Sequence, residues 1–348
     1  MTFTNTLSLQ LKGPVPEAHE PPELRGGSRD AVRLLVSTPA GHHHSQFANL
    51  VNFLCPGDLL VVNRSATIAA SLPADGRPGS FILNLSSRYG GDAHGSVWLA
   101  EPRWDFDRPG PLPLGVGEVA TVAGLRTTFL HPYPELARLW FVRFEGDVLG
   151  AASTLGQPIR YGYVATPYGL EHYQTLFGTL PGSAEMPSAS RPFTERVLRS
   201  LALKDVQIAT ITLHTGVSSL DKSDTLYPEP FNVPAETVAA IARAKASGAR
   251  VIAVGTTVVR AVESAFYDGS LHATEGFTRL YLRPGYPVAV VDGLITGLHA
   301  PEASHLEMLY ALAGETLVRE AYEEAVEAGY LWHEFGDSHL ILSGGAGV

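Results

Sequence analysis

Short apolar runs separated by glycine and proline fill the stretch from residue 63 to residue 150. The clearest runs are 81–85, 97–100, 118–122, 127–130 and 139–144, and no helical period of useful length occurs among them. Five or six short strands with turn residues between them are typical of a small barrel or sandwich. We predict a small antiparallel β-barrel domain at residues 63–150.

The flanking segments, 1–62 and 151–348, combine apolar strands with helical patterns. Strands are expected at 59–62, 206–213, 250–254, 278–282, 288–291 and 339–342, and helices at 191–201, 235–247, 302–312 and 315–328. Strands that alternate with helices predict an α/β fold, a mixed and largely parallel sheet covered by helices. Because the strand 59–62 precedes the β-only block, the barrel is expected to interrupt this α/β domain.

Composition narrows the class of protein. Of the 348 residues, 45% are hydrophobic and 17% are charged, which indicates a globular chain and excludes a disordered one. Cys55 is the only cysteine, so a disulfide framework and a cysteine-based metal cluster are excluded. The sequence has no apolar run long enough for a membrane span and no secretory signal at its start, which predicts a cytoplasmic protein with no membrane partner.

Charge is unevenly distributed along the chain. The formal net charge is −10, and residues 301–340 contribute nine acidic residues against a single base, Arg319. In contrast, residues 182–260 contain two more bases than acids. The acidic total argues against non-specific nucleic-acid binding, although it leaves room for a local basic site.

The strongest local signal is the turn that follows the strand 250–254. Gly255, Thr256 and Thr257 lead from this strand into a helix. Free N–H groups at a helix start can bind a carboxylate or phosphate, although Gly and Thr at this place can equally serve as a cap only. Arg260 and Glu263 lie three positions apart and are expected on one face of the same helix.

Two histidines and one aspartate occupy comparable places beside strands. His214 follows the strand 208–213, and His299 lies between an apolar strand and a helix. The carboxyl ends of parallel strands are where α/β proteins bind ligands, and imidazole titrates near neutrality, so both are candidate acids or bases. Each could instead be a histidine hydrogen-bonded at a strand end. Asp337, in a Gly-Asp pair before the last strand, either fixes an amine or ribose hydroxyl or forms an ordinary turn.

Other familiar sites are disfavoured by the sequence. His42, His43 and His44 are consecutive and have no carboxylate cluster beside them, so a metal site is not expected. The Gly-x-Ser-x-Gly, Walker and Gly-x-Gly-x-x-Gly motifs are absent from the sequence, which disfavours a hydrolase, an NTPase and a dehydrogenase.

Taken in order, the motifs of this sequence resemble those of the S-adenosylmethionine:tRNA ribosyltransferase-isomerase family of queuosine biosynthesis. The resemblance covers residues 33–342. The segments that carry it are Pro56-Gly-Asp-Leu-Leu-Val-Val-Asn63, Tyr173-Gln-Thr175, Thr212-Leu-His-x-Gly216, Ala253-Val-Gly-Thr-Thr-x-x-Arg260 with Glu263, Pro284-Gly-Tyr286, Thr296-x-x-His299-x-Pro301 and Tyr330-x-x-x-x-x-Gly336-Asp337.

The resemblance implies a reaction and a set of site residues. The ribosyl part of S-adenosylmethionine, the co-substrate, is transferred to 7-aminomethyl-7-deazaguanine in the tRNA anticodon and isomerised to epoxyqueuosine, with release of adenine and methionine. Because the sulfonium acidifies the adjacent C–H, a histidine or carboxylate suffices as base and no metal is implied. The residues assigned on this basis are, as catalytic groups, His214, His299 and Glu229; for S-adenosylmethionine, Gly255, Thr256, Thr257, Arg260, Glu263 and Asp337; and for tRNA, Arg191 and Arg199.

Several polar positions depart from the family pattern. The family's Asn-Asp-Thr-Arg-Val-Ile-Pro-Ala-Arg-Leu is here Asn63-Arg-Ser-Ala-Thr-Ile-Ala-Ala-Ser-Leu72, and its Ala-Pro-Thr-Ala-Gly-Leu-His-Phe is Met186-Pro-Ser-Ala-Ser-Arg-Pro-Phe193. Its Gly-Ala-Gly-Thr-Phe is Gly216-Val-Ser-Ser-Leu220, its Met-His-Ser-Glu is Leu226-Tyr-Pro-Glu229, and the Asn-Phe pair after Thr296 is Gly297-Leu298. Three interpretations therefore remain: a working enzyme, a diverged paralogue with altered substrate or lost activity, and a non-catalytic RNA-binding protein. A monomer and a homodimer are both compatible with the sequence.

Overall fold

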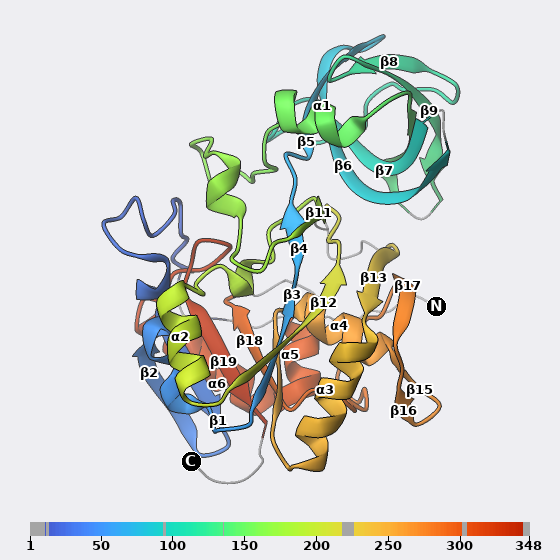
Figure 1. The fold of residues 1–348 in the computed structure, drawn as a ribbon. Helices are drawn as coiled ribbons and strands as arrows, with labels where there is room; N and C mark the ends of the chain where they lie inside the picture. The colour runs from blue at the N-terminus through green and yellow to red at the C-terminus, as the bar shows by residue number, and fades with distance from the viewer. Residues whose placement is uncertain are drawn as a thin grey trace.

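A nine-stranded mixed β-sheet forms the centre of the larger part of the molecule (Figure 1). The structure, a computed structural model, describes residues 11, 14–92, 95–134, 136–217, 226–300 and 305–343. Across the sheet the strands are β17 (Thr274–Thr278), β13 (Glu229–Val233), β12 (Gln207–Leu213), β3 (Leu59–Asn63), β14 (Val251–Val254), β18 (Gly293–Gly297), β19 (Ser338–Leu342), β1 (Arg33–Thr38) and β2 (Gly41–Gln46). The four central strands β12, β3, β14 and β18 are parallel, so they all end at one edge of the sheet, the carboxyl edge.

The central strands are covered on both faces. Every residue of β3 and β14 is buried. Within β3, Leu59 and Val61 belong to one hydrophobic cluster, whereas Leu60 and Val62 belong to another. Because successive side chains point to opposite faces, each face of the sheet must carry its own apolar layer, as parallel sheets require. The predicted α/β architecture is confirmed.

Helices supply these two layers. On the face of Leu59 lie α3 (Ala235–Ala246), α4 (Thr256–Ser264), α5 (His305–Ala313) and α6 (Glu315–Glu327). The opposite face is covered by the 3-10 helix η2 (Phe47–Phe53) and by α2 (Glu195–Leu203). Helix α2 begins at Glu195 because the Thr194 side chain caps it, accepting a hydrogen bond from the Val197 N–H at 3.3 Å.

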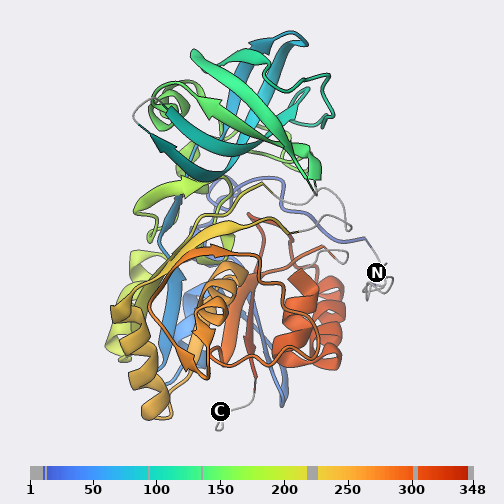
Figure 2. The same cartoon turned by 90° about the vertical axis from the view of Figure 1, so that its right-hand side faces the viewer.

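A closed six-stranded antiparallel barrel stands over the carboxyl edge of the sheet in Figures 1 and 2. Around the barrel the strands are β10 (Leu136–Phe144), β7 (Gly95–Arg103), β6 (Gly79–Asp92), β5 (Ser71–Gly76), β8 (Val119–Val122) and β9 (Leu125–Tyr133). Trp98 and Phe129 are buried inside it, and the short helix α1 (Val148–Leu155) follows the last strand. The barrel predicted from the sequence is confirmed.

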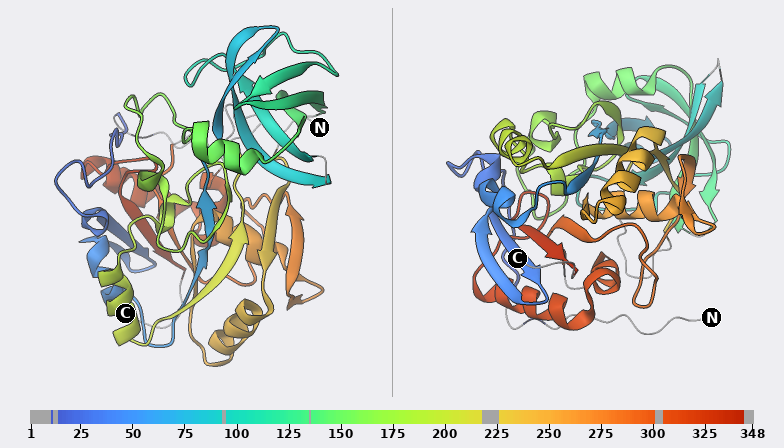
Figure 3. Two further views of the ribbon diagram at one scale, coloured as in Figure 1. Left: turned by 45° about the horizontal axis from the view of Figure 1, so that its top comes forward. Right: turned by 60° about the horizontal axis from the view of Figure 1, so that its bottom comes forward.

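The connection between the two parts is a pair of short parallel strands. Strand β4 (Ser65–Thr67) follows β3 directly and pairs with β11 (Leu180–Ser183) from the returning chain. Figure 3 shows this connection between the sheet and the barrel from two further sides. The remaining short elements are β15 (Phe266–Tyr267), β16 (Ser270–Leu271), η1 (Arg29–Ala31), η3 (Leu170–Tyr173) and η4 (Ser188–Ser190). The junction therefore places β4 and β11 beside the carboxyl edge.

Two strand predictions were wrong. The expected strands at 278–282 and 288–291 are not formed: β17 ends at Thr278, and the next strand is β18. Leu282, Val290 and Val291 are nevertheless buried against the sheet's helical layer. Their apolar character was mistaken for strand periodicity, whereas Pro284 and Pro287 keep the segment out of a ladder. Residues 302–304 of the expected helix 302–312 lie outside the described residues. Within the described part of the chain, no helix is long and apolar enough to cross a membrane.

Candidate functional site

Asn63 joins three elements at the carboxyl edge. Its side-chain Nδ2 donates to the Leu213 carbonyl at 2.8 Å and to the Thr257 hydroxyl at 3.4 Å, and its Oδ1 accepts from the Leu213 N–H at 3.1 Å. The residue is fully buried. Asn63 thus fixes the ends of β3 and β12 relative to the start of α4. Sequence analysis missed this role, although a polar residue that closes the run Leu-Leu-Val-Val was its signal.

His214, which directly follows β12, is held by a serine from the junction. Its Nδ1 lies 2.7 Å from the Ser65 hydroxyl, which donates to the Ser183 hydroxyl at 2.8 Å. Because the Ser65 hydroxyl proton is donated to Ser183, the Ser65 oxygen accepts from His214 Nδ1–H. The lone pair of the imidazole is therefore on Nε2. Burial lowers the pKa of His214, which keeps the ring neutral at pH 7. A neutral imidazole with Nε2 unprotonated is suited to accept a proton.

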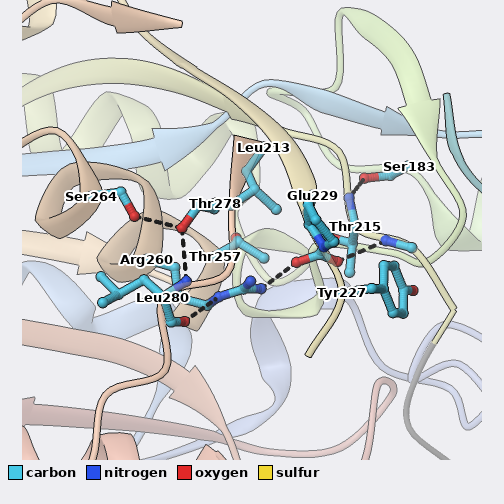
Figure 4. Close-up of polar contacts among 12 residues, drawn as sticks. Ser183, Leu213, Thr215, Tyr227, Glu229, Thr257, Arg260, Ser264, Thr278 and Leu280 are labelled. Atoms are coloured by element: carbon cyan, nitrogen blue, oxygen red, sulfur yellow. Dashed lines mark hydrogen bonds and ion pairs between the residues drawn. The ribbon is translucent and has the colours of Figure 1, made fainter. Parts of the chain in front are cut away.

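Gly182 makes room for that imidazole. A Cβ at this position would lie 2.6 Å from His214 Nδ1, closer than side chains approach one another. Ser183, the next residue, accepts a hydrogen bond from the Thr215 N–H at 3.0 Å (Figure 4). β11 therefore sets the position of His214 from one side and Ser65 from the other.

Glu229 and Arg260 form a largely buried ion pair (Figure 4), and the residue after Glu229, Pro230, accepts a hydrogen bond from the His214 backbone N–H at 3.0 Å. One carboxylate oxygen of Glu229 accepts from Arg260 Nη1 and the other accepts from the Gly216 N–H at 2.8 Å. Arg260 Nε donates to the Leu280 carbonyl at 3.1 Å, whereas its Nη2 is buried and has no hydrogen-bond partner among the residues that the structure describes. Both oxygens of Glu229 are thus in use, but the guanidinium keeps a donor for an anionic or carbonyl group of a ligand.

The start of α4 lies next to this pair. Gly255 adopts φ of 99°, a conformation that favours glycine, and donates its N–H to the Ile295 carbonyl at 2.8 Å. Within the described ranges of the chain no side chain caps the helix, so the first-turn N–H groups of Thr256 and Thr257 face the carboxyl edge without a capping acceptor there. Such a helix start attracts an anion.

His299 follows β18 and stacks on a second imidazole. Its Nε2 lies 2.8 Å from the Thr296 hydroxyl, and its ring centroid is 4.5 Å from that of His305, with 10° between the planes. Burial, and then the neighbouring His305, hold the pKa of His299 well below its ordinary value. Burial and then the Arg260 guanidinium also lower the pKa of His305, which links this stack to the Glu229–Arg260 pair.

Two carboxylates that were predicted to bind the ligand accept hydrogen bonds from the protein itself. Glu263 is 2% exposed and accepts from the N–H groups of residues 289, 290 and 291 at 2.9–3.1 Å. Asp337 accepts from the backbone N–H of Arg33 at 2.7 Å and of Leu331 at 2.8 Å, and it pairs with the Arg33 guanidinium at 3.0 Å. These contacts give both carboxylates a role in holding the fold.

The two arginines predicted to bind tRNA lie in unlike surroundings. Arg191 is 3% exposed and donates to both carboxylate oxygens of Glu23, at 2.9 and 3.0 Å, and to the His172 carbonyl. Burial lowers the pKa of this guanidinium, which is not free for a phosphate. Arg199 is exposed on α2, beside the sheet and away from the barrel (Figure 1). Its contact with tRNA stays a prediction.

A small recess lies at the carboxyl end of β18. Gly297, Ala189 and Pro192 are among the residues that line it. A Cβ at Gly297 would meet no atom within 4 Å. Pro192 and Gly297 are two of the positions at which the sequence departs from the family pattern, so these two departures meet in space.

Comparison with known proteins supports the resemblance noted from the sequence. The family model for queuosine biosynthesis proteins matches residues 14–341. The S-adenosylmethionine:tRNA ribosyltransferase-isomerase of Rubrobacter xylanophilus is 38% identical over 332 residues, which cover 91% of this chain and 92% of that protein. The enzyme of the same name from Thermus thermophilus is 36% identical over 324 residues, covering 90% of this chain and 93% of that protein.

A solved structure agrees with these sequence relatives. The crystal structure of the S-adenosylmethionine tRNA ribosyltransferase from Thermotoga maritima superposes with a TM-score of 0.53 at 28% identity, covering 94% of this chain and 96% of that one. The agreement extends over both the sheet and the barrel, and the family predicted from the motifs is confirmed. This chain belongs to the S-adenosylmethionine:tRNA ribosyltransferase-isomerase family of queuosine biosynthesis proteins.

Proposed function

We propose that this protein is an active ribosyltransferase-isomerase, which transfers the ribosyl part of S-adenosylmethionine to 7-aminomethyl-7-deazaguanine in a tRNA anticodon and isomerises it to epoxyqueuosine. Membership of the family supports the reaction. The arrangement of Ser65, His214, Glu229 and Arg260 at the carboxyl edge supports the site, since carboxyl ends of parallel strands are where α/β folds bind ligands.

Arg260 and the start of α4 bind the negative end of S-adenosylmethionine. In the part of the chain that the structure describes, Arg260 Nη2 and the first-turn N–H groups of Thr256 and Thr257 are donors without a side-chain acceptor. The methionine carboxylate of the substrate supplies that acceptor, and hydrogen bonds between charged partners are the stronger ones. Glu229 is a positioning residue in this scheme, because it holds the Arg260 guanidinium and the Gly216 backbone in place.

His214 is the group that moves the proton. The sulfonium of S-adenosylmethionine makes the adjacent ribose C–H acidic, and a neutral imidazole can remove that proton. The single observation that carries this assignment is the Ser65 contact at Nδ1, which directs the basic lone pair to Nε2. His299, neutral and bound to Thr296, is a second group for proton transfer.

The test is adenine release from S-adenosylmethionine in the presence of tRNA that carries the 7-aminomethyl-7-deazaguanine base. We expect the wild type to release adenine and to add one ribosyl-derived group to the tRNA, seen by mass spectrometry of its nucleosides. We expect His214→Gln to slow release about 10²- to 10⁴-fold while it retains affinity for S-adenosylmethionine. A folded wild type that releases no adenine contradicts the proposal.

A diverged paralogue is the second candidate. It is favoured by the two departures from the family pattern, Pro192 and Gly297, that line one recess at the carboxyl edge. The same mass measurement separates the candidates, because a different acceptor leaves the 7-aminomethyl-7-deazaguanine nucleoside unmodified in the tRNA while adenine or another product of S-adenosylmethionine still forms.

A further inference from the structure

Five rings form a continuous aromatic strip where the barrel meets the edge of the sheet. Phe141 of β10 contacts three other rings of the barrel, those of Tyr89, His131 and Tyr133, with centroids 5.2, 5.0 and 5.8 Å away. Tyr89 in turn stacks on Phe277 of β17, with centroids 5.2 Å apart and 24° between the planes. The strip therefore crosses from the barrel to the edge strand of the large sheet.

Much of this strip is open to solvent. Phe277 is 50% exposed and His131 is exposed, Tyr89 and Phe141 are partly exposed, and Tyr133 forms the buried base of the cluster. A contiguous apolar surface of this kind on a soluble domain marks a place where something binds. The large flat rings and their edge-strand position suit a planar partner that stacks.

Three arginines accompany the strip, Arg279 by contact and Arg88 and Arg143 by their places in the sequence. Arg279 directly follows β17, two residues after Phe277; it donates to the Tyr133 hydroxyl, and its guanidinium lies over that ring, 6.0 Å from the ring centroid. Arg88 precedes Tyr89 and is exposed, and Arg143 follows Phe141 by two positions and is partly exposed. The acid exposed on the same face of β17 is Glu275, which accepts from Asn232. The strip thus combines aromatic faces with nearby guanidinium groups, although the chain as a whole carries −10.

The strip leads directly to the site at the carboxyl edge. The Tyr89 hydroxyl donates to the Pro228 carbonyl at 3.1 Å, and Pro228 is the neighbour of Glu229. Burial raises the pKa of Tyr89, and the charges that act on its hydroxyl include those of Arg279 and Glu229. The strip therefore contacts the residue next to Glu229, and a chain laid along it ends beside the strand that carries the Glu229–Arg260 pair.

We infer that the aromatic strip binds the single-stranded anticodon loop of the tRNA, with unstacked bases lying on Phe277, Phe141 and His131 and with phosphates next to Arg88 and Arg279. This inference rests on the proposed function, since it names the surface that presents the tRNA base to that site. Aromatic platforms flanked by arginine are the common means of holding single-stranded RNA. The competing explanation is that the rings only pack the barrel against the sheet.

Equilibrium binding of the substrate tRNA, followed by fluorescence anisotropy, tests the inference. Phe277→Ala and His131→Ala should each weaken tRNA binding roughly 5- to 150-fold, the loss expected when a base loses its aromatic platform. Phe277→Leu keeps an apolar contact with Tyr89 but offers no stacking face, so its affinity should fall as well while its melting temperature stays that of the wild type. Arg88→Gln should lower the slope of log affinity against log salt by about one phosphate contact.

A matched control comes from α2, on the far side of the sheet from the strip. Leu203→Ala, at a side chain that is 86% exposed, should leave tRNA affinity unchanged. Wild-type affinity in both Phe277→Leu and Phe277→Ala overturns the inference, even when the enzyme still forms product. If the wild type binds neither tRNA nor S-adenosylmethionine, by anisotropy and by calorimetry, the proposed function itself fails and the inference falls with it.

Discussion

The nine-stranded sheet has two halves that use their charged groups in different ways. In the half formed by β12, β13 and the start of α4, Arg260 keeps a buried donor that has no partner among the described residues, and none of their side chains caps the helix. In the half formed by β18, β19 and the segments that lead into them, Glu263 accepts from three backbone N–H groups, and Asp337 accepts from two and from the Arg33 guanidinium. Polar residues in the first half are left for a ligand, and those in the second half hold the chain.

The comparison of the two halves shows that a polar residue next to a strand end is not by itself a binding residue. What decides its role is how many of its hydrogen-bonding sites the fold already uses, because a buried donor or acceptor without a partner costs about 1–3 kcal/mol. Arg260 bears that cost at Nη2 in the free protein, whereas Glu263 does not. A ligand that accepts a hydrogen bond from Arg260 Nη2 removes this cost, whereas Glu263 has no such cost for a ligand to remove.

The largest effect is expected from Glu263→Ala. Three backbone N–H groups lose a charged acceptor in the interior, so the free energy of unfolding should fall by about 3–5 kcal/mol, measured by urea denaturation. S-adenosylmethionine affinity of the remaining folded protein should stay within twofold of the wild type. Glu263→Gln, which keeps one oxygen acceptor, is the matched variant and should lose less stability. Unchanged stability with weakened ligand binding would erase the distinction between the two halves.

A second effect concerns His339 on β19, which is fully buried with Nε2 2.7 Å from the Ser37 hydroxyl. Burial, and then His42, lower its pKa to about 3, below the unfolded value near 6.5. The unfolded state therefore takes up the proton first, and stability falls as pH drops below about 6.5, by about 1.4 kcal/mol per pH unit until about pH 3. The loss at pH 5 is about 2 kcal/mol.

His339→Gln should remove this contribution, so that the unfolding free energy depends less steeply on pH between 7 and 5. Exposed His131 provides the control, and His131→Gln should leave the slope as it is. Equal slopes in wild type and His339→Gln would show that this histidine does not resist protonation, and that the β19 half is more open than the structure describes.

The smallest of the three effects is expected at Gly182. An alanine Cβ would press on His214 Nδ1 and displace the imidazole from Ser65, so Gly182→Ala should lower kcat about tenfold with little change in melting temperature. If the loss acts through the imidazole, Gly182→Ala combined with His214→Gln should be no slower than His214→Gln alone. Additive losses in the double variant would assign Gly182 a role apart from His214.

Most of the fold could be predicted from the sequence, because patterns of apolar residues follow burial. The barrel block, the buried strand that became β3 and the helix that became α3 were all identified. The strands expected at 278–282 and 288–291 failed, since apolar residues such as Leu282 and Val290 fill the core from an irregular segment as well as from a strand. An apolar pattern reports burial and only indirectly the backbone conformation.

The site could be predicted less well, and for a physical reason. Motif positions located Arg260 and His214 at the carboxyl edge. They could not show that Arg191 pairs with Glu23 or that Glu263 accepts from backbone N–H groups. Those partners are far away in sequence or belong to the main chain. Ser65 escaped notice for the same reason, since its contact with His214 spans 149 positions.

Calorimetric titration of S-adenosylmethionine into Arg260→Gln and Glu263→Gln tests the central claim most directly. We expect Arg260→Gln to weaken binding about 10- to 100-fold, the worth of a charge-assisted hydrogen bond, and Glu263→Gln to bind as the wild type does. Wild-type affinity in Arg260→Gln together with lost affinity in a folded Glu263→Gln would contradict this expectation and move the ligand to the other half of the sheet.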